Sequence, residues 1–326
     1  MVYAKVMSRD HSVAIGVEIG GGQTIVALID SNGHIHRCTQ ARTLRGRPAT
    51  VTLEPYLRAI DTMLTSAQSD GLQICGIGVS VPGTVDRTTR RPQIIPMLPT
   101  LNSFPLCELL ETRYNLPACL HTDVDAAVLG EHRFGAGRGY RCLLFLTVNA
   151  VVGAALVIDD KLVYPASIGH ICHLPVASSG PCCSCGKRGC INTLVSTDAI
   201  RKKVQRALRR GNETSLVRRL LNHEYFSPQL LAEEALSGDE VALQIYNDIA
   251  RWLGVALTKY IDLFEPNVLI LGGSILHAGD LLLSQVRSVV ATRSSHSSVC
   301  ICSMVEVVSA SLGHDVTLIG ATVPLF

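Results

Sequence analysis

The stretch GPCCSCGKRGC at residues 180–190 holds four of the twelve cysteines in the chain, and His173 lies shortly before it. Thiolate sulfur and imidazole nitrogen are ligands that Zn²⁺ prefers, and a structural zinc site fills all four tetrahedral positions with protein atoms. Gly186 and Gly189 allow the backbone to fold back so that several thiolates can converge. The pattern therefore indicates a metal site, with a reduced, metal-free loop as the alternative.

A second group that could do chemistry is the carboxylate of Asp123. It follows the apolar segment LPACLH, where a predicted strand ends and a helix begins. A carboxylate in this position can accept a proton from a reacting hydroxyl as a general base. It can equally cap the helix, which stabilises a helix by about 1 kcal/mol. The spacing alone leaves both roles open.

Alternating strands and helices must position these groups. Residues 12–43 are β-rich, with three consecutive glycines at residues 20–22 forming a tight turn inside the first hairpin. Residues 52–71 space their apolar side chains as a helix does, and residues 74–86 return to strand character. The succession of strand, helix and strand predicts an α/β fold.

A second cycle of strands and helices follows the first. Residues 116–137 predict a strand that runs into a helix, and residues 142–163 predict paired strands that turn at residues 159–160. Two long helical stretches, an apolar strand ending in LGGS, and a last strand and helix complete the chain. The repeated glycine-bearing hairpin predicts two related lobes.

The composition excludes several classes of function. The chain has 326 residues, of which 47% are hydrophobic, so it can bury the cores of two domains. Its net charge of +2 gives no general attraction for nucleic acid or an anionic membrane. The first residues lack the pattern of a secretory signal, and no apolar run could span a bilayer. We therefore expect a cytoplasmic protein with reduced cysteines that acts on a small molecule.

The order of the segments resembles the ROK family of sugar kinases and repressors. The resemblance covers nearly the whole chain, and the cysteine segment is its most specific part. The segments that carry it, in order, are VEIGGGQTIVALID, GIGVSVPGTVD, PMLPTLNSFPL, HTDVDAAVLGE, TVNAVVGAALV, GHICHLPV with the cysteines that follow it, LFEPNVLILGGS and SLGHDVTLIGAT.

The resemblance implies an α/β fold of the two-lobe, actin-like ATPase (ribonuclease H-like) type. We expect a small lobe at residues 1–120, joined by the C-terminal helix, and a larger lobe at residues 121–326 that carries a zinc loop at residues 173–190. Four protein ligands leave no position for an activated water, so the zinc is expected to be structural. The ligands implied by the resemblance are His173, Cys183, Cys185 and Cys190, which leaves Cys182 as an extra cysteine.

On the phosphate side, the resemblance implies that Mg-ATP would bind at two loops and an adenosine-side turn. Glu18 stands where the family has Asp, and Gly22 stands where it has Thr. In the second loop, Ala150 and Val151 replace Thr and Gly, and a β-branched side chain opposes the backbone shape that glycine allows. These changes argue against efficient use of ATP. The residues implied in cofactor binding are Glu18, Gly20, Gly21, Gly22, Gly153, Gly272 and Gly273.

On the sugar side, the resemblance implies that Asp123 is the general base. Several neighbouring positions differ from the family pattern. Met97 and Thr122 each replace an Asn, Asp125 replaces another, and His170 and Asn192 each replace a Glu. The residues implied in substrate binding are Met97, Thr122, Asp123, His170, His173 and Asn192.

Three functions compete on this evidence. The changes affect both the phosphate side and the sugar side, whereas a kinase with a new substrate should keep its phosphate side. We therefore expect a protein that binds a sugar-like ligand between its lobes and has weak or lost ATP-dependent phosphoryl transfer. The alternative is an active hexose or N-acylhexosamine 6-kinase, or one that uses another phosphoryl donor. A DNA-binding repressor would need an added helix-turn-helix domain, so no nucleic-acid partner is expected. The resemblance also implies a homodimer or homotetramer.

Overall fold

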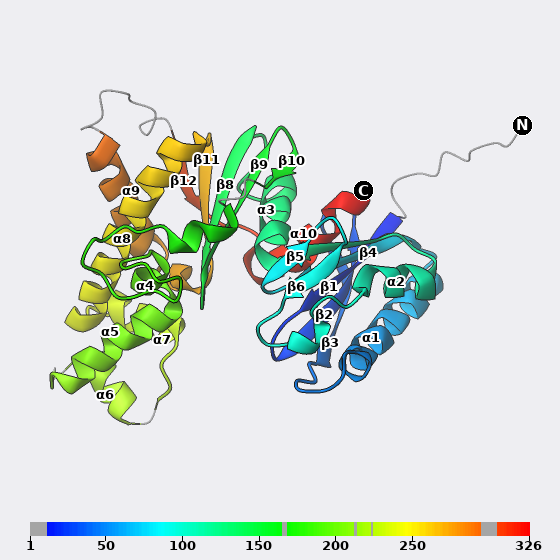
Figure 1. Cartoon of the computed structure of the whole chain (residues 1–326), viewed down its shortest axis with the longest axis horizontal. Coiled ribbons are helices and arrows are strands. Elements are labelled where there is room, and N and C mark those ends of the chain that lie inside the picture. The colour runs from blue at the N-terminus through cyan, green and yellow to red at the C-terminus, as the bar shows by residue number, and fades with distance from the viewer. Residues whose placement is uncertain (1–11, 165–167, 212–213, 223, 295–304) are drawn as a thin grey trace, which may run out of the picture. The chain divides into compact units, whose positions relative to one another are not determined.

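The structure, a computed structural model, describes residues 12–164, 168–211, 214–222, 224–294 and 305–326. The chain divides into two compact units (Figure 1). The first comprises Met1–Arg138 together with Ser311–Phe326, and the second comprises residues 139–310. Each unit has its own sheet and its own hydrophobic core.

This division differs from the boundary predicted at residue 120. The helix α3 (Asp123–Phe134) belongs to the first unit because it packs closely on α10 (Val316–Thr322). The two helices cross at a glycine: a Cβ atom on Gly320 would lie 1.7 Å from the carbonyl oxygen of Ala126. The first unit therefore continues through α3, and the C-terminal helix completes it.

A five-stranded sheet of order β3-β2-β1-β4-β7 forms the centre of the first unit. The strand β1 runs antiparallel to β2 and parallel to β4, while β2 pairs antiparallel with β3 and β4 pairs parallel with β7. A small antiparallel sheet of β5 and β6 follows β4. The strands are β1 (Ser12–Ile19), β2 (Gln23–Asp30), β3 (Ile35–Arg42), β4 (Gln73–Val81), β5 (Thr84–Asp86), β6 (Arg91–Ile94) and β7 (Ala118–Thr122).

The side chains of β1 show why helices cover both faces of this sheet. Val13 and Ile15 are buried in one core with Tyr56 of α1. Gly16, the residue after Ile15, faces α10, where a Cβ atom would lie 2.8 Å from the carbonyl oxygen of Leu318. Helices α1 and α2 thus cover one face, and α10 with α3 covers the other. The first two span Ala49–Ser69 (α1) and Leu106–Tyr114 (α2).

The sheet of the second unit repeats the arrangement of the first, with order β10-β9-β8-β11-β12. The strand β9 runs antiparallel to both its neighbours, β10 and β8, whereas β8, β11 and β12 are parallel. The predicted turn between β9 and β10 is present, with Asp159 and Asp160 both at positive φ. The strands are β8 (Cys142–Val148), β9 (Val152–Ile158), β10 (Lys161–Val163), β11 (Val268–Gly272) and β12 (Glu306–Ser309).

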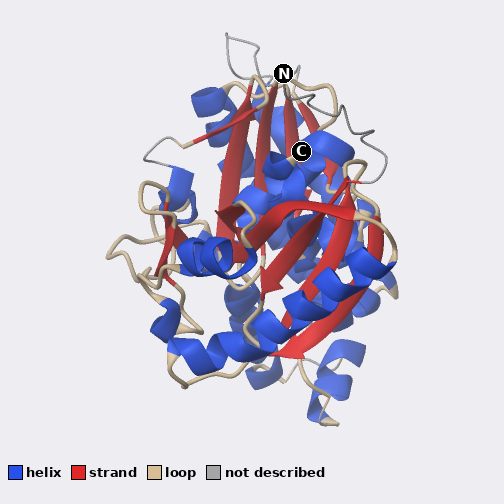
Figure 2. Ribbon diagram, turned by 90° about the vertical axis from the view of Figure 1, so that its right-hand side faces the viewer, coloured by secondary structure: helices blue, strands red, loops and turns tan. Residues whose placement is uncertain are grey.

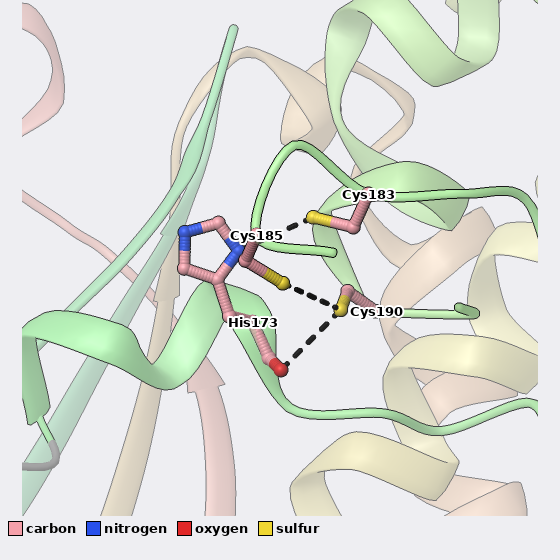
Figure 3. A group of neighbouring side chains, drawn as sticks. All are labelled: His173, Cys183, Cys185 and Cys190. Atoms are coloured by element: carbon pink, nitrogen blue, oxygen red, sulfur yellow. Dashed lines mark hydrogen bonds between the residues drawn. The ribbon is translucent and has the colours of Figure 1, made fainter. Parts of the chain in front are cut away.

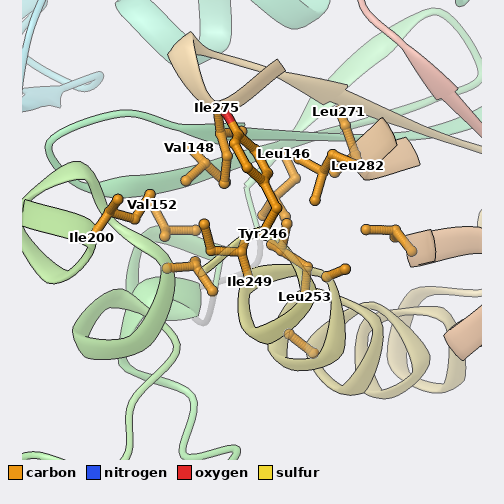
Figure 4. Close-up of a cluster of buried hydrophobic side chains, with 14 of the residues drawn as sticks. Leu146, Val148, Val152, Ile200, Tyr246, Ile249, Leu253, Leu271, Ile275 and Leu282 are labelled. Carbon is orange, nitrogen blue, oxygen red and sulfur yellow. The ribbon is translucent and has the colours of Figure 1, made fainter. Parts of the chain in front are cut away.

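Figure 2 shows the helices and strands of both units. Helices pack against the second sheet around a large apolar core, part of which Figure 4 shows. Tyr246, Ile249 and Leu253 of α8 lie in that core with Leu146 of β8 and Leu271 of β11 (Figure 4). Within the described residues, no helix is both long and apolar enough to cross a membrane. The helices are α4 (Asn192–Val195), α5 (Thr197–Arg209), α6 (Ser215–Leu221), α7 (Pro228–Leu236), α8 (Glu240–Phe264) and α9 (Asp280–Ser294).

Candidate functional site

In the second unit, the four predicted metal ligands come together. The ligand atoms of His173, Cys183, Cys185 and Cys190 all lie within 4.8 Å of one another. Figure 3 shows the three sulfur atoms and the imidazole ring converging. His173 Nδ1 lies 3.2 Å from Cys183 Sγ, and the sulfur atoms of Cys185 and Cys190 lie 3.6 Å apart. Sulfur ligands of a tetrahedral zinc lie about 3.8 Å from each other, so the donor set fits Zn²⁺.

Backbone geometry explains why the cysteines converge. Gly189 has a positive φ of 63°, and a Cβ atom there would lie 1.7 Å from the carbonyl oxygen of Ala177. Gly186 also has positive φ, at 86°, but no atom within 4 Å would meet its Cβ atom. Isolated β-bridges join Pro175 to Cys190 and Cys182 to Arg188, which closes the loop. Both glycines are therefore required for backbone conformation, and Gly189 also for space.

The protonation of the thiols also suits a bound cation. Burial acts to raise the pKa of Cys183, but hydrogen bonds from the Cys185 backbone and from His173 outweigh it and lower that pKa to about 6. Burial and hydrogen bonds with Cys185 and Cys183 raise the pKa of Cys190 to about 12. Without a cation the cluster therefore keeps the proton of Cys190, and a bound metal ion would displace that proton and hold the sulfur as a thiolate. The extra cysteine, Cys182, is exposed, and its sulfur accepts a hydrogen bond from Arg188 Nη1 at 2.9 Å.

Helix α8 fixes the segment that carries the histidine ligand. His173 is the last residue of the 3₁₀ helix Ile168–His173. Tyr260 of α8 donates its buried hydroxyl to the carbonyl oxygen of Ile171 at 2.9 Å, and Lys259 donates to that of Pro175 at 3.0 Å. The backbone of His170 lies in the same 3₁₀ helix, but its side chain lies outside what the structure describes.

In the first unit, Asp123 is the first residue of α3, directly after β7. The helix cap is its neighbour Thr122, whose Oγ1 accepts a hydrogen bond from the Asp125 backbone at 3.1 Å. Asp123 Oδ1 accepts only the local N–H of Val124, at 2.8 Å, among the hydrogen bonds of the described residues. The cap that the sequence offered as an alternative role for Asp123 is therefore provided by Thr122.

The surroundings of Asp123 raise the pKa of its carboxyl toward neutral pH. Burial raises the pKa of Asp123 to about 6, against the lowering effect of the Val124 N–H, and the carboxylates of Asp125 and Glu18 add to the rise. Burial also raises the pKa of Glu18, at the end of β1, although Thr317 Oγ1 donates to Glu18 Oε2 at 2.6 Å. A carboxylate with a pKa near 6 can accept a proton at physiological pH.

Asp125 lies beside this pair and has a partner of its own. Arg87, from the turn between β5 and β6, donates to Asp125 Oδ2 at 2.5 Å. The carboxylate of Asp125 is nearly buried, while the guanidinium is partly exposed. Burial lowers the pKa of His121, which precedes Thr122 on β7. The first unit thus gathers three carboxylates and a guanidinium at the start of α3.

The first glycine turn joins β1 to β2, and its carbonyl groups are held from one side. Thr43 donates its hydroxyl to Gly20 O at 2.8 Å and its backbone N–H to Gly22 O at 3.2 Å. Arg45 donates to Gly21 O. Met97 lies against the same turn, since a Cβ atom on Gly21 would be 2.4 Å from its sulfur. The structure therefore brings the predicted sugar-side residue Met97 to the predicted phosphate turn.

The second loop, between β8 and β9, is closed by hydrogen bonds from side chains of the protein itself. Asn149 Oδ1 accepts the Ser274 N–H at 2.9 Å, and Asn149 Nδ2 donates to Thr147 Oγ1 at 3.2 Å. Asn192 Oδ1 accepts the Val152 N–H, also at 2.9 Å. The side chain of Val151 is 56% exposed at the tip of the loop.

The remaining predicted glycines have packing roles near this loop. Gly153 lies inside β9, opposite Thr147, and not in the turn itself. Gly273 has a φ of 96°, and a Cβ atom there would lie 2.4 Å from the carbonyl oxygen of Val148. A Cβ atom on Gly272 would meet the ring of Phe145 at 2.7 Å. These close approaches join the ends of β8 and β11.

Comparison with known proteins decides the family. A sequence model described as the ROK family matches residues 14–324. The chain belongs to the ROK family. A glucokinase of Thermotoga maritima is 30% identical over 314 residues, which cover 94% of this ROK chain and 95% of that protein. A xylose repressor of Caldicellulosiruptor bescii is 25% identical over 88% of this chain and 72% of the repressor.

Solved ROK structures share the fold. A ROK family glucokinase from Streptomyces griseus, solved in complex with glucose and AMPPNP, superposes with a TM-score of 0.75. It is 28% identical and covers 95% of this chain, which in turn covers 97% of that structure. The predicted α/β class of actin-like sugar kinases is therefore confirmed.

Sequence reasoning missed two residues of this ROK chain. Asn149 joins the second loop to Ser274 through a hydrogen bond. The sequence did carry a clue to this role, because the amide can both donate and accept in a loop whose other side chains are small or apolar. Arg87 gave no signal. Its contact with Asp125 depends on the path of the β5–β6 hairpin, which spacing along the chain does not show.

Proposed function

We propose that this ROK protein binds a sugar-like ligand and that its ATP-dependent phosphoryl transfer is weak or lost. The observation that supports this most strongly is the closed second loop. Two backbone N–H groups, that of Val152 at the end of this loop and that of Ser274 in the turn after β11, already donate to the side-chain amides of Asn192 and Asn149. Phosphate is bound by backbone N–H groups that converge without other partners. An incoming phosphate would have to displace these amides and pass the exposed side chain of Val151.

The phosphate side therefore fits Mg-ATP poorly, whereas the sugar side retains its central group. Asp123 is half-buried, has a pKa of about 6 and makes only a local hydrogen bond among the described residues. A sugar hydroxyl could donate to this carboxylate and be oriented by it. The glucokinase of Thermotoga maritima and the glucose complex of the Streptomyces griseus enzyme support a hexose as the ligand class.

The same carboxylate supports the second candidate, an active hexose or N-acylhexosamine 6-kinase. In that case Asp123 accepts the proton of the attacking hydroxyl, which a base with a pKa near 6 can do at neutral pH. Glu18, whose pKa is also raised by burial, would hold the magnesium ion. Mg-ATP, when bound, supplies the phosphoryl group.

We propose that His173, Cys183, Cys185 and Cys190 bind a structural zinc. When zinc is bound, these four side chains fill its coordination positions, and the ion stabilises the loop between residues 173 and 190. The proposal includes a cytoplasmic location, self-association into homodimers or homotetramers, and no binding of nucleic acid or membrane. Family resemblance supports self-association, and the near-balanced charge supports the absence of polyanionic partners.

Calorimetry on protein of verified zinc content tests the proposed function. Mg-ATP is titrated alone and then in the presence of glucose, mannose, N-acetylglucosamine and N-acetylmannosamine. We expect at least one sugar to bind without nucleotide, and nucleotide to give no saturable heat. The Asp123→Asn variant should weaken sugar binding about tenfold or more, because it removes a charged acceptor. Micromolar Mg-ATP binding that a sugar strengthens would support the active kinase instead.

A further inference from the structure

A line of hydrogen bonds leads from the metal cluster to the second loop. Cys190 is one of the four cluster residues, and Asn192 follows it by two positions. Asn192 Oδ1 accepts the Val152 N–H at 2.9 Å. A second contact is made a few residues later, where the Thr197 N–H donates to the Asn149 carbonyl oxygen at 2.8 Å. The chain that leaves the cluster therefore holds the loop at two points.

The line continues beyond the loop through Asn149. Its side-chain oxygen accepts the Ser274 N–H at 2.9 Å, and its side-chain nitrogen donates to Thr147 at 3.2 Å. Ser274 follows Gly273, the turn that ends β11. Two asparagine amides thus connect the cluster, the β8–β9 loop and the turn after β11.

The segment between Cys190 and Asn192 is rigid enough to transmit a displacement. Cys190 and Ile191 are fully buried, and the Ile191 N–H donates to the carbonyl oxygen of Leu174 at 3.0 Å. Ile191 belongs to the same hydrophobic core as Val148 and Val152, which flank the second loop. Figure 4 shows Val148 and Val152 in that core. Close-packed side chains of this kind cannot absorb a shift of one residue without moving their neighbours.

We propose that Asn192 is a positioning residue that couples metal occupancy of the cluster to the shape of the loop at residues 149–152. With metal bound, Cys190 is held, and Asn192 keeps its oxygen on the Val152 N–H. Without metal, no ion joins Cys183, Cys185 and Cys190, so Cys190 moves. The Val152 N–H then loses Asn192 Oδ1 as its acceptor. The inference rests on the proposed metal site, and it holds whether or not phosphoryl transfer survives.

Hydrogen exchange of the full chain, followed by mass spectrometry, tests the role of Asn192 in zinc-loaded protein. Asn192→Ala removes the acceptor, and Asn192→Asp, the matched control, keeps an oxygen in the same place. We expect the Val152 amide to exchange about tenfold faster in Asn192→Ala than in the wild type and at the wild-type rate in Asn192→Asp. Equal exchange of residues 149–152 in Asn192→Ala and wild type would overturn the proposal.

Removing the metal tests the coupling itself. Zinc is withdrawn with a chelator or by Cys185→Ser, and Cys182→Ser serves as control because Cys182 lies outside the cluster. Exchange of residues 149–152 should rise in the wild type without zinc, stay unchanged in Cys182→Ser, and rise no further in Asn192→Ala. A rise confined to residues 171–191 would overturn the coupling. If the metal-free chain unfolds, the exchange of residues 149–152 in zinc-loaded Asn192→Ala decides whether the proposal stands.

Metal content, measured by elemental mass spectrometry, separates the two proposals. A folded chain that takes up no zinc would contradict the metal proposal and this inference together. A chain that binds one zinc per monomer but shows no effect of Asn192→Ala would contradict this inference alone. Neither result depends on sugar binding or on nucleotide turnover.

Discussion

At the scale of the residue, Asp123 is defined by its surroundings more than by its position in the sequence. The chain places an aspartate between a strand and a helix, where a cap and a base are equally reasonable. The structure shows that Thr122 caps the helix and that Asp123 lies half-buried beside the carboxylates of Asp125 and Glu18. The sequence could not show this, because burial depends on helix α10, whose residues lie almost two hundred positions away.

The raised pKa of Asp123, about 6 against an ordinary 3.8, predicts a pH dependence of stability. Between these two pH values the carboxyl of Asp123 is protonated in the folded protein and ionised in the unfolded chain. Its contribution to the free energy of unfolding is therefore fully present below about pH 4 and is lost as the pH rises through about 6. The Asp123→Asn variant cannot ionise. Its free energy of unfolding relative to wild type should therefore rise by up to about 3 kcal/mol between pH 4 and pH 7.5.

Urea unfolding of wild type and Asp123→Asn at the two pH values measures this difference. The other titrating groups are common to both proteins, so they cancel in the comparison. A difference that stays constant from pH 4 to pH 7.5 would show that the carboxyl titrates normally and would remove the argument for a near-neutral base.

At the scale of the element, turns and loops carry the features that distinguish this chain. The hairpins, the helix α1 and the strands β4 and β7 follow from periodicity and from glycine turns. These elements were predicted from the sequence. The hydrogen bond from Ser274 to Asn149 was not predicted, because it joins loops that are 125 positions apart. Such contacts depend on the register of β8 with β11, which local patterns do not specify.

The zinc loop gives a prediction at this scale, because its two glycines differ in their surroundings. Gly189→Ala places a methyl group against the Ala177 carbonyl oxygen, whereas Gly186→Ala meets nothing within 4 Å. Gly186→Ala should cost about 1–2 kcal/mol of stability from positive φ alone. Gly189→Ala should cost more than this and lower zinc affinity at least tenfold.

Competition with a chromophoric zinc chelator measures affinity, and thermal unfolding of the zinc-loaded proteins measures stability. Equal zinc affinity for the two variants would mean that the loop relaxes around Ala177 and that its close approach does not shape the cluster.

At the scale of the whole molecule, the chain leaves the first unit after Arg138 and returns to it at Ser311. The buried carboxylate of Glu131 holds both segments on the side of the first unit. It accepts hydrogen bonds from the Ser311 and Leu312 N–H groups at 2.8 and 2.9 Å and from Ala136 N–H at 2.8 Å. The predicted boundary at residue 120 differs from this division, because this contact and the α3–α10 crossing cannot be seen in local sequence patterns.

Glu131→Gln is predicted to destabilise the first unit. A glutamine amide keeps one acceptor oxygen but turns an NH₂ group toward backbone donors, so hydrogen bonds are lost and donors are left buried. The cost should be about 2–4 kcal/mol, while Ser311→Ala, which removes only the 3.1 Å bond to the same carboxylate, should cost about 1 kcal/mol. Urea unfolding checks both, and equal costs for the two variants would contradict this role of Glu131.

We propose that this ROK chain keeps a sugar site and that its closed second loop prevents efficient phosphoryl transfer. The most direct test is the sugar-dependent formation of ADP from Mg-ATP by zinc-loaded protein, with Asp123→Asn as the blank. We expect a rate no greater than that of the blank for glucose, mannose, N-acetylglucosamine and N-acetylmannosamine. Turnover that one of these sugars stimulates and Asp123→Asn abolishes would contradict it and establish an active sugar kinase.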